Sequence, residues 1–135
     1  MNIAIEQARI ASTNGETPVG AVIVKDNEII SKSHNKTIEL CDCTAHAEIL
    51  VIREASIKLN SWRLSECSLY VTLEPCIMCF GAIKNARISK LIFGAYNHES
   101  GFDNHYNLQT NLKYIGGIEK EACKSILDSH FNNIR

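Results

Sequence analysis

The feature that most constrains this chain is a pair of cysteines three residues apart, directly behind a proline and an apolar run. The run SLYVTL at residues 68–73 predicts a strand, and Pro75 suits the first position of a helix over residues 76–86. Residues three apart share a helical face, so the sulfurs of Cys76 and Cys79 can reach one ion. A helix N-terminus favours the thiolate, the metal-binding form of cysteine. The sequence therefore predicts a metal site where this strand meets its helix.

The rest of the chain alternates between helical and extended patterns. The predicted helices cover residues 2–13, 45–59 with Thr44 as N-cap, and roughly 118–132, and the further predicted strands cover residues 19–25, 28–33, 90–95 and 112–115. Residues 96–111 show no clear period and are expected to form a polar loop. This order predicts an α/β fold in which helices cover both faces of a sheet.

Length, charge and cysteine content narrow the class of protein. The 135 residues contain no repeat or linker, so we expect a single domain over residues 1–135. The net charge of -1 lacks the basic excess of a protein that binds nucleic acid mainly through phosphate charge, but it allows a local RNA-binding patch. Charged residues interrupt the N-terminal apolar run, and no stretch approaches transmembrane length, so we expect a cytoplasmic protein. In that compartment, six cysteines favour metal binding or catalysis over disulfides.

A second group of chemically active residues lies in the run CTAHAEIL. His46 is expected in the first turn of its helix, and Glu48 follows two residues later, so the two side chains point in different directions. His46 can then be the third ligand of a metal held by Cys76 and Cys79, with Glu48 beside the metal. Zinc lowers the pKa of bound water to about 7, and a neighbouring carboxylate can move that proton to a leaving group.

Each part of this pattern is weak evidence alone. A lone C-x-x-C is often a structural zinc or redox motif, and a lone H-x-E on a helix is often a surface pair. Together and in this order, H-x-E followed by P-C-x-x-C is a recognised pattern of zinc-dependent nucleobase deaminases.

At these residues the chain resembles the bacterial tRNA adenosine deaminase family. The matching segments are ETPVGAVIV (16–24), Asn35, TAHAEIL (44–50), SWRL (61–64), LYVTLEPCIMCFGAI (69–83) and RISKLIFGA (87–95). The resemblance implies a three-layer α-β-α cytidine deaminase-like fold with a mixed five-stranded central sheet. It also implies conversion of adenosine to inosine at the wobble position of a tRNA anticodon, by a homodimer.

The resemblance also implies roles for individual residues. His46, Cys76 and Cys79 would bind one Zn²⁺ per chain, and Glu48 would be the catalytic proton shuttle. The side chain of Asn35 and the backbone of Ala47 would contact the flipped base. After Ala95 the chain departs from the family: Asn97 replaces the usual aspartate, and the loop over residues 96–111 is shorter. That segment contacts the nucleotide in the family, so Asn97 is a further candidate substrate-binding residue.

Two alternatives stay open. The altered 96–111 loop allows a deaminase of a free base or nucleoside, such as guanine or cytosine. A non-catalytic zinc module would close its site with Cys41 or Cys43 as a fourth ligand, although such a site has no use for Glu48. We expect Cys41 and Cys43 to pack within their loop as small apolar residues, and Trp62 to be a packing residue.

Overall fold

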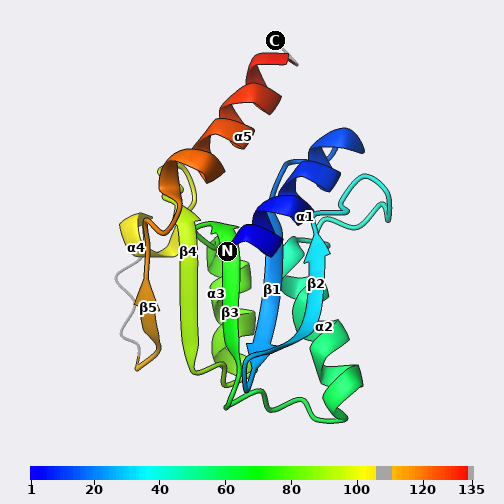
Figure 1. The fold of residues 1–135 in the computed structure, drawn as a ribbon, viewed down its shortest axis with the longest axis vertical. Coiled ribbons are helices and arrows are strands. Elements are labelled where there is room, and N and C mark those ends of the chain that lie inside the picture. Colours follow the sequence, from blue (N-terminus) through cyan, green and yellow to red (C-terminus); the bar gives the residue numbers. More distant parts are fainter. Residues whose placement is uncertain (106–110, 134–135) are drawn as a thin grey trace.

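A computed structural model of the protein describes residues 1–105 and 111–133 (Figure 1). Its elements are α1 (Asn2–Thr13), β1 (Gly20–Lys25), β2 (Glu28–His34), α2 (Ala47–Leu59), β3 (Ser68–Leu73), α3 (Ile77–Asn85), β4 (Lys90–Ala95), α4 (Phe102–His105), β5 (Lys113–Ile115) and α5 (Lys120–Asn133). In the described residues, no helix is long and apolar enough to cross a membrane.

The five strands form one mixed sheet in the order β2-β1-β3-β4-β5. Strand β1 is antiparallel to both β2 and β3, whereas β4 is parallel to β3 and to β5. Asp26 and Asn27 join β1 to β2 with positive φ values of 51° and 62°, which suits a tight hairpin turn between right-twisted strands. The parallel pair β3–β4 needs a crossover, and α3 provides it.

The helices lie on both faces of the sheet, as Figure 1 shows. Helices α1 and α5 pack on one face, and α2 and α3 pack on the other. Small residues bring α1 close to the sheet: a Cβ on Gly20 of β1 would lie 2.0 Å from the carbonyl oxygen of Ala4. The expected three-layer α/β fold with a mixed five-stranded sheet is therefore confirmed.

Two helix starts differ from the sequence prediction. Helix α2 begins at Ala47 with His46 as its N-cap, because the amide and hydroxyl of Thr44 donate instead to Oδ1 of Asp42, at 2.9 Å and 2.6 Å. Helix α3 likewise begins one residue later than expected, with Cys76 as its N-cap. Pro75 therefore precedes the helix and does not occupy its first turn.

Helix α4 was not expected from the sequence. The ring of Phe102 stacks on Phe80 of α3, with 4.3 Å between centroids, and packs edge-on against Phe93 of β4. These contacts join residues far apart in the sequence, so a local pattern does not reveal them. Residues 106–110 of the predicted 96–111 loop lie outside the described residues.

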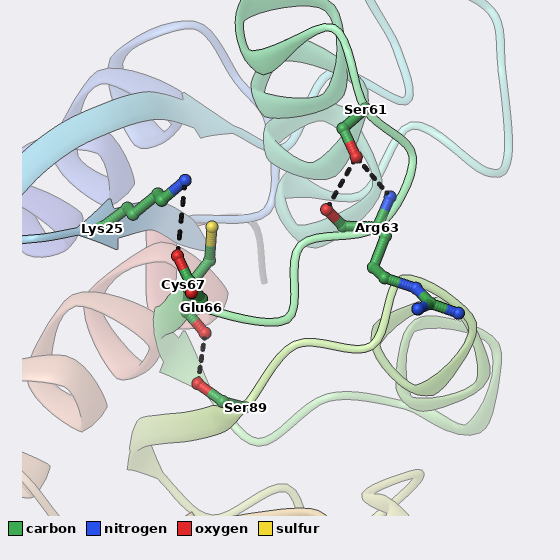
Figure 2. Close-up of polar contacts among 6 residues, drawn as sticks. All are labelled: Lys25, Ser61, Arg63, Glu66, Cys67 and Ser89. Atoms are coloured by element: carbon green, nitrogen blue, oxygen red, sulfur yellow. Dashed lines mark hydrogen bonds and ion pairs between the residues drawn. The ribbon is translucent and has the colours of Figure 1, made fainter.

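The connection from α2 to β3 lies at the opposite end of β3 from the cysteine pair. Figure 2 shows its contacts: Ser89 donates to the carbonyl oxygen of Cys67 at 2.9 Å, and Lys25 pairs with the exposed Glu66 at 3.7 Å. Trp62 is 62% exposed, with the Arg63 guanidinium 5.2 Å from its ring centroid. The prediction that Trp62 is a packing residue is wrong.

Candidate active site

Three potential metal ligands from the starts of two helices, α2 and α3, meet at one end of the sheet. Nδ1 of His46 lies 3.4 Å from Sγ of Cys79 and 3.7 Å from Sγ of Cys76. In a tetrahedral site with bonds of about 2.0–2.3 Å, ligand atoms lie roughly 3.3–3.8 Å apart. The spacing and the nitrogen and sulfur donors therefore fit a zinc-like ion.

The two helix starts position these ligands. His46 and Cys76 both have extended backbone as N-caps, with ψ values of 152° and 173°. Cys79 lies in the first turn of α3 and is fully buried. Because α2 and α3 pack together on the same face of the sheet, their N-terminal ends bring the imidazole to the two sulfurs.

The ligand group, which consists of His46, Cys76 and Cys79, favours the thiolate form of one cysteine. The hydrogen bond from the Cys79 thiol, helped by the one from His46, lowers the pKa of Cys76 to about 4 despite its burial. The same contact with Cys76, together with burial, raises the pKa of Cys79. The hydrogen bond to Cys76 also raises the pKa of His46 above its ordinary value. The lowered pKa of Cys76 favours its thiolate, which is the form that binds metals.

Glu48 lies beside this group without joining it. Its side chain is only 4% exposed, and it lines the same cavity as His46 and Cys76. The set of mutually close ligand atoms contains His46, Cys76 and Cys79, but not the Glu48 carboxylate. Burial raises the pKa of the Glu48 carboxyl group above its ordinary value.

The ligand group opens onto a cavity of about 250 Å³. Its lining residues are Thr17, Val19, Asn35, Thr37, His46, Glu48, Leu73, Glu74, Cys76, Asn97 and Ser100. Of the other predicted site residues, Cys79 is buried in the first turn of α3, and Ala47 is the fully buried first residue of α2. The structure therefore places six of the predicted site residues in the cavity lining or among its three potential ligands, whereas Ala47 is buried directly after His46 and is not part of the lining.

Asn97 lies in the cavity wall and also makes hydrogen bonds within its own loop. Its side-chain amide donates to Oγ of Ser100 at 3.0 Å, and its side-chain carbonyl accepts from the Ser100 amide at 3.1 Å. These two hydrogen bonds close a turn, so Asn97 shapes the wall on which it lies.

Sequence reasoning missed two buried acids next to the cavity. Glu16 and Glu74 are 2% and 1% exposed, and each carboxylate accepts backbone hydrogen bonds from a loop of the cavity wall. Both belong to segments noted in the sequence, ETPVG and LEPC, but no local spacing reveals which distant amides they pair with.

Cys41 and Cys43 are exposed, so the prediction that they pack within their loop is wrong. Cys41 adopts a positive φ of 49°, and its thiol points to the carbonyl oxygen of Ile38 at 3.8 Å. Among residues 1–105 and 111–133, neither cysteine belongs to the ligand group. A fourth protein ligand from this loop, as a closed structural zinc site requires, is not present in the described arrangement.

Comparisons with known proteins find relatives that match the whole chain. The model of the MafB19-like deaminase family matches residues 1–135. A tRNA-specific adenosine deaminase of Buchnera aphidicola (subspecies Schizaphis graminum) is 42% identical over 142 residues, which span 100% of this chain and 93% of the relative.

Two solved structures extend the comparison. One, from a study of A-to-I editing by tRNA:A34 deaminases at the wobble position, has a TM-score of 0.88 and 41% identity, covering 94% of this chain and 97% of that one. Guanine deaminase from Bacillus subtilis also reaches 41% identity, but with a TM-score of 0.68 and coverage of 70% and 61%. The A34 deaminase structure thus matches over far more of both chains.

Proposed function

The chain belongs to the tRNA-specific adenosine deaminase family, and from this membership we infer that it converts adenosine to inosine at the wobble position of a tRNA. The reaction adds water to the adenine ring and releases ammonia. The observation that carries the inference is a His-Cys-Cys group and a separate buried carboxylate that meet at one cavity.

We propose that one Zn²⁺ per chain is held by Nδ1 of His46 and the sulfurs of Cys76 and Cys79. The fitting spacing of these atoms and the low pKa of Cys76 support this proposal. When bound by three protein ligands, zinc keeps an open coordination position and supplies nucleophilic water by lowering its pKa to about 7.

Glu48 is the proposed proton shuttle. Its carboxylate takes the proton that the nucleophilic water gives up and delivers it to the ring nitrogen adjacent to the carbon that bears the amine. It then takes a second proton from the hydroxyl group now bonded to that carbon and gives it to the amine, which leaves as ammonia as the carbonyl forms. The raised pKa of this buried carboxyl group suits a residue that must both accept and donate protons.

Three residues are proposed to hold the flipped base. The Asn35 side chain and Asn97 lie in the cavity wall, on opposite loops. Ala47 is the first residue of α2, where a helix leaves its N–H groups without intrahelical partners. The side-chain amides and these backbone groups offer donors and acceptors to the polar edge of a nucleobase. Because the net charge is -1, tRNA binding has to depend on local contacts and not on overall charge attraction.

The family resemblance further supports a single domain over residues 1–135, a homodimer and a cytoplasmic location. The dimer is tested by light scattering during size-exclusion chromatography. The expected mass is twice the 15.1 kDa of the chain, and a mass of one chain at working concentration contradicts the proposal.

The substrate is tested with zinc-loaded protein and an anticodon stem-loop that carries adenosine at the wobble position. A matched stem-loop with guanosine there, and free adenosine, guanine and cytidine, are the comparison substrates. Mass spectrometry of the products should find inosine in the first stem-loop alone. Xanthine from free guanine, or uridine from cytidine, would show that the substrate is a free base or nucleoside and not tRNA. Absence of product with every substrate would refute the proposed deaminase activity.

A further inference from the structure

The polar walls of the cavity come from two loops. Asn35 and Thr37 lie on the loop after β2, while Asn97 and Ser100 lie on the loop after β4. Each of these loops accepts support from one buried carboxylate: Glu16, in the connection between α1 and β1, holds the first loop, and Glu74, directly after β3, holds the second.

Glu16 holds the first loop through three hydrogen bonds. Oε1 accepts from the amide of Ile38 at 3.1 Å and from the hydroxyl of Thr37 at 3.3 Å, and Oε2 accepts from the amide of Glu39 at 2.8 Å. Burial opposes the charge of Glu16, but these hydrogen bonds outweigh it and keep the pKa of its carboxyl group below the ordinary value.

Backbone hydrogen bonds also hold the residues of this loop that lie next to the cavity. The amide of Asn35 donates to the carbonyl oxygen of Val19 at 3.1 Å, and that of Lys36 donates to Ala45, next to His46, at 3.0 Å. Fixing the backbone at Thr37 therefore leaves Asn35 little freedom, since the loop is held on both sides of it.

Glu74 holds the second loop in an equivalent way. Oε1 accepts from the amide of Asn97 at 3.1 Å, and Oε2 accepts from the amide of Asp103 at 2.9 Å. A Cβ on Gly101 would lie 2.4 Å from Oε2 of Glu74, so this position requires glycine for the loop to close over the carboxylate. The Phe102 amide adds a hydrogen bond of 3.0 Å to the carbonyl oxygen of Pro75.

We propose that Glu16 and Glu74 are paired positioning residues, each of which sets one wall of the base-binding cavity. The proposal deepens the proposed function and rests on it for the identity of the substrate. Glu16 is not part of the cavity lining, so its effect on the substrate passes through Asn35 and Thr37. Glu74 is part of the lining but only 1% exposed, and both of its oxygens already accept hydrogen bonds from the second loop, so its main effect passes through Asn97 and Ser100. Loss of either acid should weaken substrate binding more than it slows the chemical step.

The first test replaces each acid with its near-isosteric amide. In Glu16→Gln and Glu74→Gln, an NH₂ group faces a backbone N–H that formerly donated to oxygen, so at least one hydrogen bond is lost. The matched controls are Glu39→Gln and Glu99→Gln, which remove the same charge from exposed positions on the same two loops. All four proteins are compared with wild type by hydrogen exchange, zinc content and kinetics on the adenosine stem-loop.

We expect each substitution to affect only the loop that the replaced carboxylate holds. Amide protection falls at residues 37–39 in Glu16→Gln and at residues 97–103 in Glu74→Gln, while zinc stays at one per chain. The KM for the stem-loop rises at least fivefold, kcat changes less than twofold, and the controls match wild type. Unchanged protection, a KM within twofold of the controls, or a fall in kcat at constant KM would overturn the proposal.

A second pair of variants decides the matter if either amide variant does not fold. Glu16→Asp and Glu74→Asp keep the charge but withdraw each carboxylate by one methylene. Both should reproduce the loss of protection and the rise in KM, and wild-type behaviour would refute the corresponding arm. Hydrogen exchange needs no turnover, so it tests the anchoring even where the stem-loop assay refutes the substrate.

Discussion

The metal-binding group and the cavity walls of this protein are held by different means. His46, Cys76 and Cys79 lie on the first residues of two helices that pack together beneath the sheet. The walls lie on loops, each held by one buried carboxylate together with a few backbone hydrogen bonds. The geometry of the ligands therefore depends on a whole packed layer, whereas each wall depends on a few hydrogen bonds. Asn97, where the chain departs from the family pattern, lies on a wall.

The largest effect is expected from breaking the ligand group. Cys79→Ala should lose its zinc, because two remaining ligands hold the ion poorly, and activity on the adenosine stem-loop should fall to background. Elemental analysis and product formation measure the two losses. Cys67→Ala, which removes another buried thiol far from the site, is the control and should keep both. Full zinc content in Cys79→Ala would refute the ligand assignment.

Removing the proposed proton shuttle should separate metal binding from turnover. Glu48→Ala is expected to keep one zinc per chain while kcat falls about 10²–10⁴-fold, the usual contribution of general acid–base catalysis. Glu54→Ala removes an exposed carboxylate from the same helix and should leave the rate unchanged. A near-normal rate in Glu48→Ala would show that another group moves the protons.

Replacing a residue of the cavity wall should have a smaller effect, which appears mainly in substrate binding. Asn97→Ala removes the two hydrogen bonds to Ser100, and we expect kcat/KM for the stem-loop to fall about 2–12-fold, mainly through KM. Zinc content should not change. Asn132→Ala on α5 is the control. A loss of zinc in Asn97→Ala would mean that wall and ligand group are not independent.

The smallest effect is expected from the charge of Glu16 on stability. The pKa of its carboxyl group is lowered in the folded protein, so the charge stabilises the fold above the ordinary pKa near 4.5 and this stabilisation disappears as the pH falls through the folded value. At pH 7, Glu16→Gln should melt about 4 °C below wild type, for about 1 kcal/mol of lost hydrogen bonding. The difference should shrink in melting curves below about pH 4.5. A gap that stays constant from pH 7 to pH 3 would contradict this account.

Much of the arrangement followed from local patterns. The run SLYVTL before Pro75 identified β3, and the cysteine spacing placed Cys76 and Cys79 on one helical face. The N-cap of α2 was misplaced because Asp42 competes for Thr44, a contact that the helical pattern of residues 45–59 does not contain. Helix α4 escaped prediction because its stability comes from Phe102 stacking on a distant ring.

The sequence by itself determined most of the strands and helices of this protein, its three potential ligands and the acid two residues from the histidine. These features depend on periodicity and short spacing, which act within a few residues. Only the tertiary structure decided that the Glu16 and Glu74 carboxylates hold the two cavity walls, and that Cys41 and Cys43 remain outside the ligand group. Hydrogen bonds between distant segments exist only after the sheet and its helices have packed, so no local pattern encodes them.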